Sequence, residues 1–329
     1  MSKTTILGGE PLGHNAPIRQ KALMSDIVLH HYNESPYAEK IRTLLGHKGL
    51  SWRSVIVPRI APKPDLVALT GGYRKVPVLQ IGADLFCDTR LIAWELERLA
   101  PQPSIQASAG GWNDIVEHWV DLNLFSKAVA YTFGKNVDHL PDAFLADRAA
   151  LRGAPLDREA LKKSVPLAEQ DLSTQVAWVE NGLSKAQPFV NGEAPGSADF
   201  TLYSTLWFAR NGRFDFSRFP ATSNWMSRMQ AFGHGDRVEM TADEAIALAS
   251  AASPADLSYE SVSPDAAGLS LGQHVSVAPE MLGHGTAVQG ALVGINAQRL
   301  TVVQRTERCG IVHVHFPRLG YRIKTVSTS

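Results

Sequence analysis

The sequence predicts three folded segments in succession: an α/β segment, an all-helical segment and a small all-β barrel or sandwich. Strand-like and helix-like patterns alternate over residues 25–104, and apolar residues recur at helical spacing over residues 105–252. Valine- and glycine-rich runs with period-two alternation follow over residues 271–329. A chain of 329 residues is long enough for two or three domains.

The α/β segment is predicted to run strand, helix, strand, loop, strand, strand, helix. The first helix begins at Pro36, because proline suits the first helical turn, and it ends near Gly46. Residues 58–64 are predicted to form a loop. The strands are expected at residues 27–32, 52–57, 76–81 and 84–87, and the second helix at residues 89–99.

The helical segment contains five helix-like patterns, and the all-β segment contains four strand-like runs. Residues 253–270, rich in Ser, Pro, Asp and Ala, are predicted to be a linker, and residues 1–24 a flexible arm. The helices are expected at residues 112–131, 167–182, 197–210, 225–232 and 242–252, and the strands at residues 275–277, 287–293, 300–303 and 311–316.

Composition excludes several classes of protein. A 44% hydrophobic and 19% charged content excludes disorder as the main state, and no apolar run is long enough for a membrane span or a signal peptide. With only Cys87 and Cys309, a disulfide scaffold is excluded and a cytoplasmic location is expected. Zero net charge argues against a nucleic-acid partner. The charge is uneven, however: residues 106–250 carry 13 basic and 18 acidic side chains, and residues 290–329 carry 6 and 1.

Four positions in the α/β segment could carry chemistry, and each has a structural alternative. Ser35 lies at a helix N-terminus, where it caps the helix or stabilises an anion such as a thiolate. Val76-Pro77 begins a strand, either as a trans edge proline or as a cis bond that turns the Val76 backbone toward a peptide-like ligand. Asp88-Thr89 opens a helix, as a cap or as a site for an ammonium and a carboxylate. Lys63, in the loop before Pro64, is by itself expected to be an exposed lysine.

Together these positions resemble the thioredoxin-like domain of the glutathione S-transferase family. The resemblance rests on Tyr-Asn-Glu-Ser-Pro-Tyr-Ala-Glu-Lys-Ile-Arg at residues 32–42, Arg-Lys-Val-Pro-Val-Leu at residues 74–79 and Cys-Asp-Thr-Arg-Leu-Ile at residues 87–92. The segment 105–252 is similar to the family's helical domain, where residues 196–200 match its buried capping motif with Gly196 in place of the usual hydroxyl residue.

The resemblance implies a glutathione site with a serine-type catalytic residue. It places Ser35 beside the thiol, with Tyr32 as the alternative hydroxyl. It implies that Lys63 contacts the glycine carboxylate and that Val76, held by Pro77, pairs with the cysteinyl backbone. Asp88 and Thr89 would meet the γ-glutamyl group, although the family more often has Glu or Gln with Ser there.

The sequence therefore predicts a glutathione transferase that conjugates the glutathione thiolate to an electrophilic small molecule and acts in detoxification. The alternative is a non-catalytic glutathione-binding or regulatory protein on the same fold. The family implies a homodimer, and no metal, nucleic-acid or membrane partner is expected. His313 and His315 share a strand face, but a metal site would need a third ligand, and only Cys309 is close in sequence.

Overall fold

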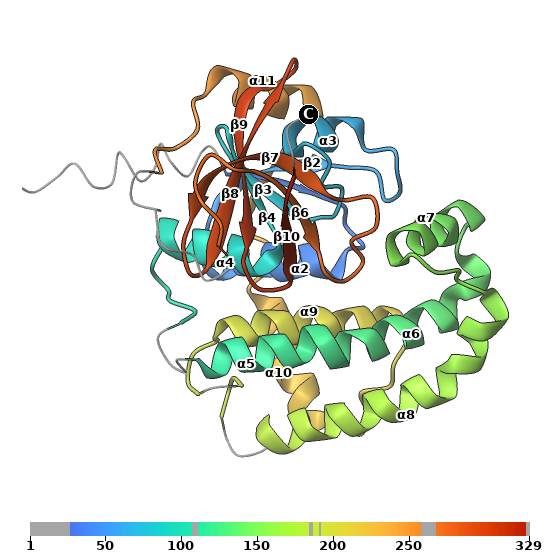
Figure 1. Cartoon of the computed structure of the whole chain (residues 1–329). Coiled ribbons are helices and arrows are strands. Elements are labelled where there is room, and N and C mark those ends of the chain that lie inside the picture. Colours follow the sequence, from blue (N-terminus) through green and yellow to red (C-terminus); the bar gives the residue numbers. More distant parts are fainter. Residues whose placement is uncertain (1–26, 107–110, 184–186, 191, 258–267, 327–329) are drawn as a thin grey trace, which may run out of the picture.

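The structure, a computed structural model, describes residues 27–106, 111–183, 187–190, 192–257 and 268–326. The predicted arm at residues 1–24 and the central part of the predicted linker lie outside these residues. Within them the predicted fold class is confirmed: an α/β unit, a helical unit and a set of antiparallel C-terminal strands follow one another (Figure 1).

The α/β unit is built from four strands and three helices. Its strands are β1 (Ile27–His31), β2 (Ser51–Ile56), β3 (Val78–Ile81) and β4 (Asp84–Cys87), and its helices are α2 (Pro36–His47), α3 (Pro64–Thr70) and α4 (Thr89–Leu99). β1 pairs in parallel with β2 and antiparallel with β3, and β3 pairs antiparallel with β4. Alternate residues of β1 enter different cores, because Ile27 and Leu29 face α2 and α4 while Val28 faces the opposite side.

The helical unit packs against the face of the sheet that α2 and α4 cover (Figure 1). Its core is formed by apolar side chains from α6, α8, α9 and α10, among them Tyr131, Leu172, Phe200 and Trp225. The elements are α5 (Trp112–Trp119), the π-helical turn η1 (Val120–Leu124), α6 (Phe125–Asn136), the 3₁₀ turn η2 (Val137–His139), α7 (Asp142–Arg152), α8 (Arg158–Leu183), α9 (Ser197–Asn211) and α10 (Pro220–Ala231). Helix α11 (Ala242–Ala251) packs instead on the opposite face of the sheet, where Ala245 shares a cluster with Val28 and Val55 (Figure 1).

The unusual glycine in the capping motif has a structural explanation. Gly196 is the N-cap of α9, and the Oδ1 atom of Asn113 accepts a hydrogen bond from the backbone N–H of Ala198 at 3.4 Å, which replaces the expected hydroxyl. A Cβ atom at Gly196 would lie 2.4 Å from Asn113 Oδ1, so the amide occupies the space of a larger side chain. The Asp199 carboxylate completes the motif by accepting from Gly196 N and Trp225 Nε1.

The C-terminal strands extend the sheet of the α/β unit. They are β6 (His274–Pro279), β7 (Val288–Ile295), β8 (Arg299–Thr306), β9 (Gly310–Pro317) and β10 (Tyr321–Thr325), and they are antiparallel among themselves. β9 pairs in parallel with β4, so that ten strands run in the order β10-β6-β7-β8-β9-β4-β3-β1-β2-β5. Their apolar side chains share one core with α3, β3 and β4, including Leu69, Val78 and Leu85.

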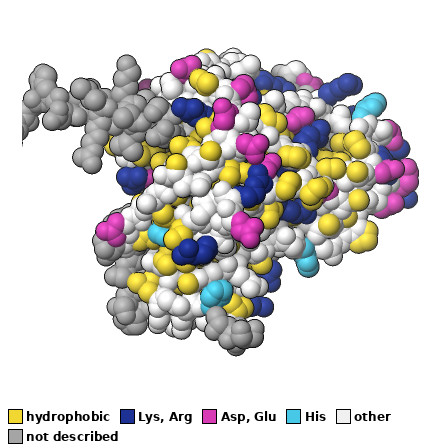
Figure 2. Space-filling model, turned by 90° about the horizontal axis from the view of Figure 1, so that it is seen from above, with side chains coloured by type: hydrophobic (Ala, Val, Ile, Leu, Met, Phe, Trp, Pro, Cys, Tyr) yellow, Lys and Arg dark blue, Asp and Glu magenta, His cyan; other side chains and the backbone are white. Residues whose placement is uncertain are grey.

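Four elements are absent from the sequence prediction. Helix α3 follows the predicted loop 58–64, α7 lies between α6 and α8, and β10 follows the last predicted strand. The helical region also contains a strand, β5 (Asp236–Glu239), which pairs in parallel with β2. The proposed domain limits at residues 104, 252 and 270 stay a prediction. Arg308, in the turn between β8 and β9, forms ion pairs with Asp65 of α3 and Asp243 of α11. On the face seen in Figure 2, basic and acidic side chains are interspersed.

Candidate functional site

Three of the predicted site segments meet at one edge of the sheet. His30 of β1 is in register with Val78 of β3, which in turn pairs with Cys87 of β4. Because β3 runs antiparallel to both neighbours, its start lies beside the ends of β1 and β4. The loop 32–35, the pair Val76-Pro77 and the pair Asp88-Thr89 therefore share this edge, and the Val76–Pro77 peptide bond is cis.

Ser35 is the N-cap of α2. Its Oγ accepts a hydrogen bond from the backbone N–H of Ala38 at 3.2 Å, and its side chain is buried, with 2% of the residue exposed. The capping role foreseen in the sequence is thus present. A serine hydroxyl that accepts one hydrogen bond still has its own proton to donate. Ser35 can therefore cap the helix and also donate a hydrogen bond to an anion such as a thiolate.

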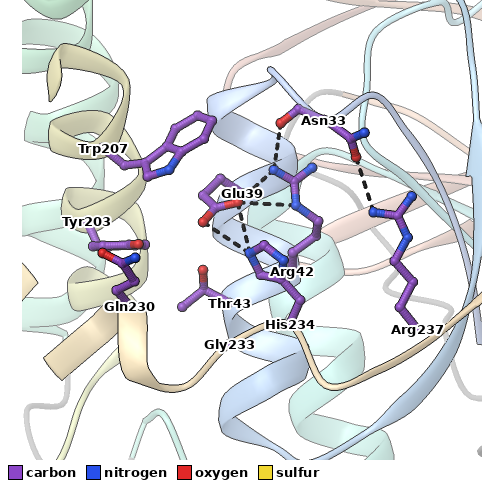
Figure 3. A pocket seen from close by; sticks show the side chains of 10 residues that line it. All are labelled: Asn33, Glu39, Arg42, Thr43, Tyr203, Trp207, Gln230, Gly233, His234 and Arg237. Carbon is purple, nitrogen blue, oxygen red and sulfur yellow. Dashed lines mark hydrogen bonds and ion pairs between the residues drawn. The ribbon is translucent and has the colours of Figure 1, made fainter. Parts of the chain in front are cut away.

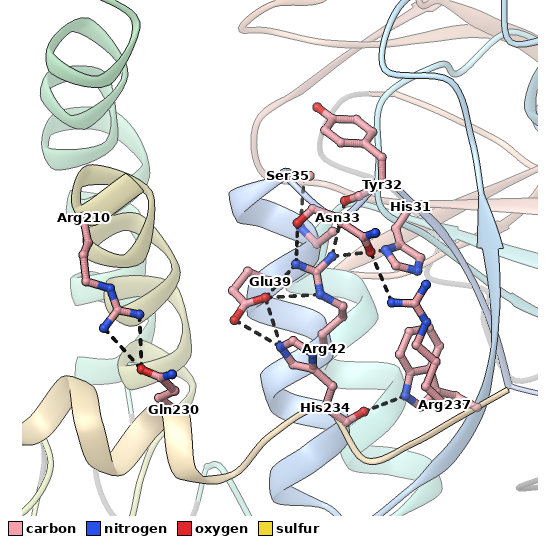
Figure 4. A network of polar contacts seen from close by, with 12 residues as sticks. His31, Tyr32, Asn33, Ser35, Glu39, Arg42, Arg210, Gln230, His234 and Arg237 are labelled. Carbon is pink, nitrogen blue, oxygen red and sulfur yellow. Dashed lines mark hydrogen bonds and ion pairs between the residues drawn. The ribbon is translucent and has the colours of Figure 1, made fainter. Parts of the chain in front are cut away.

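The loop that carries Ser35 is fixed by one guanidinium (Figure 4). Arg42 of α2 donates to the backbone oxygens of Tyr32 (3.3 Å) and Asn33 (2.8 Å), and to the ring Nδ1 of His31 (3.1 Å). Its two remaining N–H groups bind the Glu39 carboxylate at 3.2 and 2.6 Å. All five guanidinium donors are thereby used.

This network also fixes the protonation of His31. Because its Nδ1 accepts from Arg42, its Nε2 carries the proton and donates to Ser54 Oγ at 3.1 Å. Burial, reinforced by the positive charge of Arg42, lowers the pKa of His31 to about 3, so the ring is neutral at pH 7. No role for Arg42 or His31 is predicted from the sequence, since the contacts of Arg42 with the loop join residues 9 to 11 positions apart, which no local pattern connects.

Lys63 lies in a cationic cluster at the same edge. It is 5% exposed, its Nζ lies 5.5 Å from the centroid of the Tyr32 ring, and burial followed by the charge of Arg148 lowers its pKa to about 8. The Asp147 carboxylate of α7 pairs with Arg74 at 2.6 Å and with Arg148. Two arginines thus pair with Asp147, and Lys63, which interacts electrostatically with all three, leaves an excess of positive charge that suits a ligand carboxylate.

Arg148 connects the helical unit to the candidate site. It donates to the Tyr32 hydroxyl at 3.3 Å and to the Arg59 carbonyl oxygen at 3.0 Å. The Asp147 carboxylate also accepts from Ala61 N at 3.0 Å. Helix α7, which the sequence did not reveal, therefore holds the loop before Lys63.

The acidic end of the site is at Asp88. This residue is the N-cap of α4 with φ 80° and ψ 135°, a conformation that costs about 1–3 kcal/mol and persists where the surroundings enforce it. Its Oδ1 accepts from Arg90 N at 3.0 Å, and its Oδ2 accepts from the hydroxyl of Tyr321 in β10 at 3.3 Å. Thr89, the first residue of α4, is 6% exposed.

A separate cleft of about 390 Å³ runs along α2 (Figure 3). It lies between α2, α9 and the segment that leads to β5, and its lining includes Asn33, Arg42, Trp207 and His234. None of the predicted glutathione residues lines it. It adjoins the site through Asn33, whose carbonyl Arg42 binds.

The two histidines of β9 lie beside Asp84 of the neighbouring strand β4. His315 Nε2 contacts Asp84 Oδ1 at 2.8 Å, and His313 Nδ1 lies 3.7 Å from the same oxygen. Within the described ranges, no group of three or more His, Cys, Asp or Glu side chains could hold a metal ion. In the same part of the chain, no helix combines the length and apolarity that crossing a membrane requires.

Comparisons with known proteins agree with this architecture. Residues 29–104 match the family model for the glutathione S-transferase N-terminal domain, and residues 142–231 match the model for the C-terminal domain. No curated protein sequence matches the chain.

Solved structures extend the match. A crystal structure of a GST-like protein from Pseudomonas syringae is 37% identical, with a TM-score of 0.76 over 92% of this chain and 100% of that one. The part of this chain that lies outside the match is shorter than strands β6–β10 together. The similarity to this protein therefore includes part of the C-terminal sheet. A glutathione S-transferase from Rhodospirillum rubrum F11 (18% identity, TM-score 0.51, 62% of this chain and 88% of that one) and FzlA from C. crescentus (18%, 0.50, 63% and 88%) share the fold. The chain belongs to the glutathione S-transferase family.

Proposed function

We propose that this protein is a glutathione transferase, which conjugates the thiolate of glutathione to an electrophilic small molecule. The observation that carries the proposal is the separation of charge along one sheet edge. A cationic cluster surrounds Lys63, while the Asp88 carboxylate and the N-terminus of α4 lie at the end of β4. Glutathione has a carboxylate at its glycyl end and an ammonium with a carboxylate at its γ-glutamyl end, so its charges complement this edge.

Each residue then has a defined role in binding. Lys63 contacts the glycyl carboxylate, and the negative charge of that group raises the lysine pKa, which offsets part of the lowering caused by burial. The backbone of Val76, turned by Pro77, pairs with the cysteinyl residue. Asp88 binds the γ-glutamyl ammonium, and Thr89 with its free backbone N–H binds the adjoining carboxylate.

In this proposal Ser35 is the catalytic residue. Its hydroxyl donates to the glutathione sulfur, and the N-terminus of α2 adds a favourable field for negative charge. Lowering a thiol pKa by about two units corresponds to roughly 2.7 kcal/mol of stabilisation of the thiolate. The thiolate is the nucleophile that attacks the electrophile.

Titration calorimetry with glutathione, followed by conjugation of a chromogenic aryl halide, tests the proposal. We expect binding in the micromolar to millimolar range and a large fall in kcat in Ser35→Ala with little change in affinity. Tyr32→Phe is the matched control, because it removes the alternative hydroxyl, which Arg148 already contacts. If Tyr32→Phe loses the activity and Ser35→Ala keeps it, the catalytic role belongs to Tyr32. No heat at millimolar glutathione refutes the proposal.

A non-catalytic glutathione-binding or regulatory protein is the second candidate. It is favoured by the burial of Ser35 and by its use as the α2 cap. The same measurements separate the two, since this candidate binds glutathione without conjugating any electrophile.

We also propose a cytoplasmic homodimer with a role in detoxification. Exposed apolar side chains on α5, η1 and α8 support self-association: Trp112 is 66% exposed, Ile115 57% and Trp178 58%. Sedimentation equilibrium of the whole chain tests this, and a monomer at micromolar concentration refutes it.

A further inference from the structure

The C-terminal sheet reaches the proposed glutathione site. Although β10 lies at the far end of the strand order from β4, the sheet curls so that Tyr321 touches Asp88, which follows β4. The ring of Phe316 in β9 packs against Tyr73 with centroids 5.9 Å apart. The carbonyl of Met281, in the loop between β6 and β7, accepts from Lys75 Nζ at 3.4 Å. Three parts of the C-terminal sheet thus contact segments next to the site.

Two buried tyrosines form a directed chain of hydrogen bonds ending at Asp88. The hydroxyl of Tyr321 donates to Asp88 Oδ2 at 3.3 Å, and the Tyr73 hydroxyl lies 3.1 Å from the Tyr321 hydroxyl. Each hydroxyl has one proton. Since Tyr321 donates its proton to Asp88, Tyr73 must be the donor to Tyr321. Burial raises the pKa of both tyrosines, so both protons stay in place at neutral pH.

The contact leaves Asp88 able to bind a ligand. A carboxylate can accept about four hydrogen bonds, and Arg90 N and Tyr321 account for two of them. One donor comes from α4 and the other from β10, so the carboxylate is held from two sides. The backbone of Asp88 has a positive φ of 80°, a conformation that persists where the surroundings enforce it, and these two hydrogen bonds contribute to that support.

We propose that Tyr321 is a positioning residue of the glutathione site. Its hydroxyl holds the Asp88 carboxylate toward the ammonium of the γ-glutamyl group, and the C-terminal sheet thereby sets the preference for ligands that carry this ammonium. The inference rests on the proposed function, because it assigns the γ-glutamyl end of glutathione to Asp88.

The test compares two ligands that differ by one group. Glutathione and its deaminated analogue glutaryl-cysteinylglycine are titrated calorimetrically into the wild-type chain, Tyr321→Phe and Tyr131→Phe. The last is the matched control, because Tyr131 is also buried and its hydroxyl donates to a backbone carbonyl, that of Arg213, at 3.3 Å. We expect Tyr321→Phe to weaken glutathione binding by about fivefold and to leave binding of the analogue unchanged. Tyr131→Phe should change neither affinity.

A double variant makes the assignment specific. In an Asp88→Ala background the wild-type preference for glutathione is lost, and adding Tyr321→Phe should then have no further effect on it. If Tyr321→Phe does not fold, Tyr73→Phe replaces it, since that variant removes the donor to the Tyr321 hydroxyl and should cause a smaller loss in the same direction.

The outcomes are distinguishable. A wild-type chain that does not bind glutathione refutes the proposed function itself. A wild-type chain that binds glutathione, with a Tyr321→Phe variant that weakens both ligands equally or neither, overturns the positioning role and leaves the proposed function standing.

Discussion

Replacing Asp84 with alanine should strongly destabilise the whole chain, because this carboxylate fastens the C-terminal strands to the α/β unit. Asp84 begins β4, and its Oδ1 accepts from His315 Nε2 in β9 at 2.8 Å. Its Oδ2 accepts from the backbone N–H of Ala255 at 2.8 Å. On the other side of the ring, Thr301 Oγ1 lies 2.8 Å from His315 Nδ1 and is its donor. Asp84 and both of these side chains are buried.

The magnitude follows from the two hydrogen bonds to the carboxylate. A hydrogen bond to a charged group contributes about 1.5–3 kcal/mol, so the loss of both in Asp84→Ala should lower the free energy of unfolding by about 3–6 kcal/mol. Asp84→Asn can accept from only one of the two donors, because its amide NH₂ faces the other. It should lose roughly half as much.

Urea unfolding at pH 7.5, followed by far-UV circular dichroism, measures these losses. Asp236→Ala is the control, since Asp236 is an exposed strand carboxylate whose bond to Ser51 Oγ is also exposed, and it should change the free energy by less than about 0.5 kcal/mol. A loss below about 1 kcal/mol in Asp84→Ala, or equal losses in the alanine and asparagine variants, would refute the reasoning.

Three further predictions concern charge. Burial lowers the pKa of His30 to about 4 and that of His31 to about 3, so the unfolded chain binds more protons below pH 6.5. As the pH drops from 7 to 5.5, each ring should therefore lower the free energy of unfolding by up to about 1.4 kcal/mol per pH unit. Asp121 and Asp199, whose pKa burial raises to about 6, oppose only part of this fall, and urea titrations that show no fall would contradict the prediction. The lowered pKa of Lys63, about 8, predicts that affinity for S-methylglutathione, which has no thiol to titrate, falls between pH 7 and 9. In Lys63→Gln that part of the calorimetric pH dependence should vanish. Arg42→Lys keeps the charge but offers three donors instead of five, so the free energy of unfolding should fall by about 2–3 kcal/mol. The kcat should fall as well, because Arg42 fixes the loop 32–35 that carries Ser35. Unchanged kinetics in a folded variant would contradict this role of the loop.

Local signals made the first strands and helices predictable. The run 27–32, Pro36 at a helix start and the pair Val76-Pro77 each have a pattern that depends on near neighbours. The structure has β1 at Ile27–His31 and α2 from Pro36, while β3 begins at Val78, two residues later than predicted, and the Val76–Pro77 bond takes the cis form of the two alternatives. Whether Ser35 and Lys63 serve glutathione stays a prediction.

Short elements escaped the sequence patterns. Strand β5 has four mostly exposed residues with three charges, so its alternation is indistinguishable from that of a polar loop. Helix α3 spans seven residues, too few for a clear apolar stripe. Helix α7 is longer, but of its eleven residues only Phe144, Leu145 and Leu151 are buried.

Tertiary pairing left no local signal either. The register of β4 with β9 and the contact of Tyr321 with Asp88 join segments more than two hundred residues apart. The alternation in β9 predicted a strand but not its neighbour, because period-two patterning reports which face is buried and not which edge is paired.

The pairing of β4 with β9 has a consequence for the biosynthesis of the chain. Translation completes β4 long before β9 exists, so throughout the synthesis of the helical unit the β4 edge lacks the strand that will cover it. Unpaired strand edges are templates for aggregation, and late non-local pairing slows folding. The nascent protein therefore has an uncovered β4 edge until β9 is made. A chain that terminates before β9 would expose this edge and would also lack Tyr321, the residue that we propose positions Asp88.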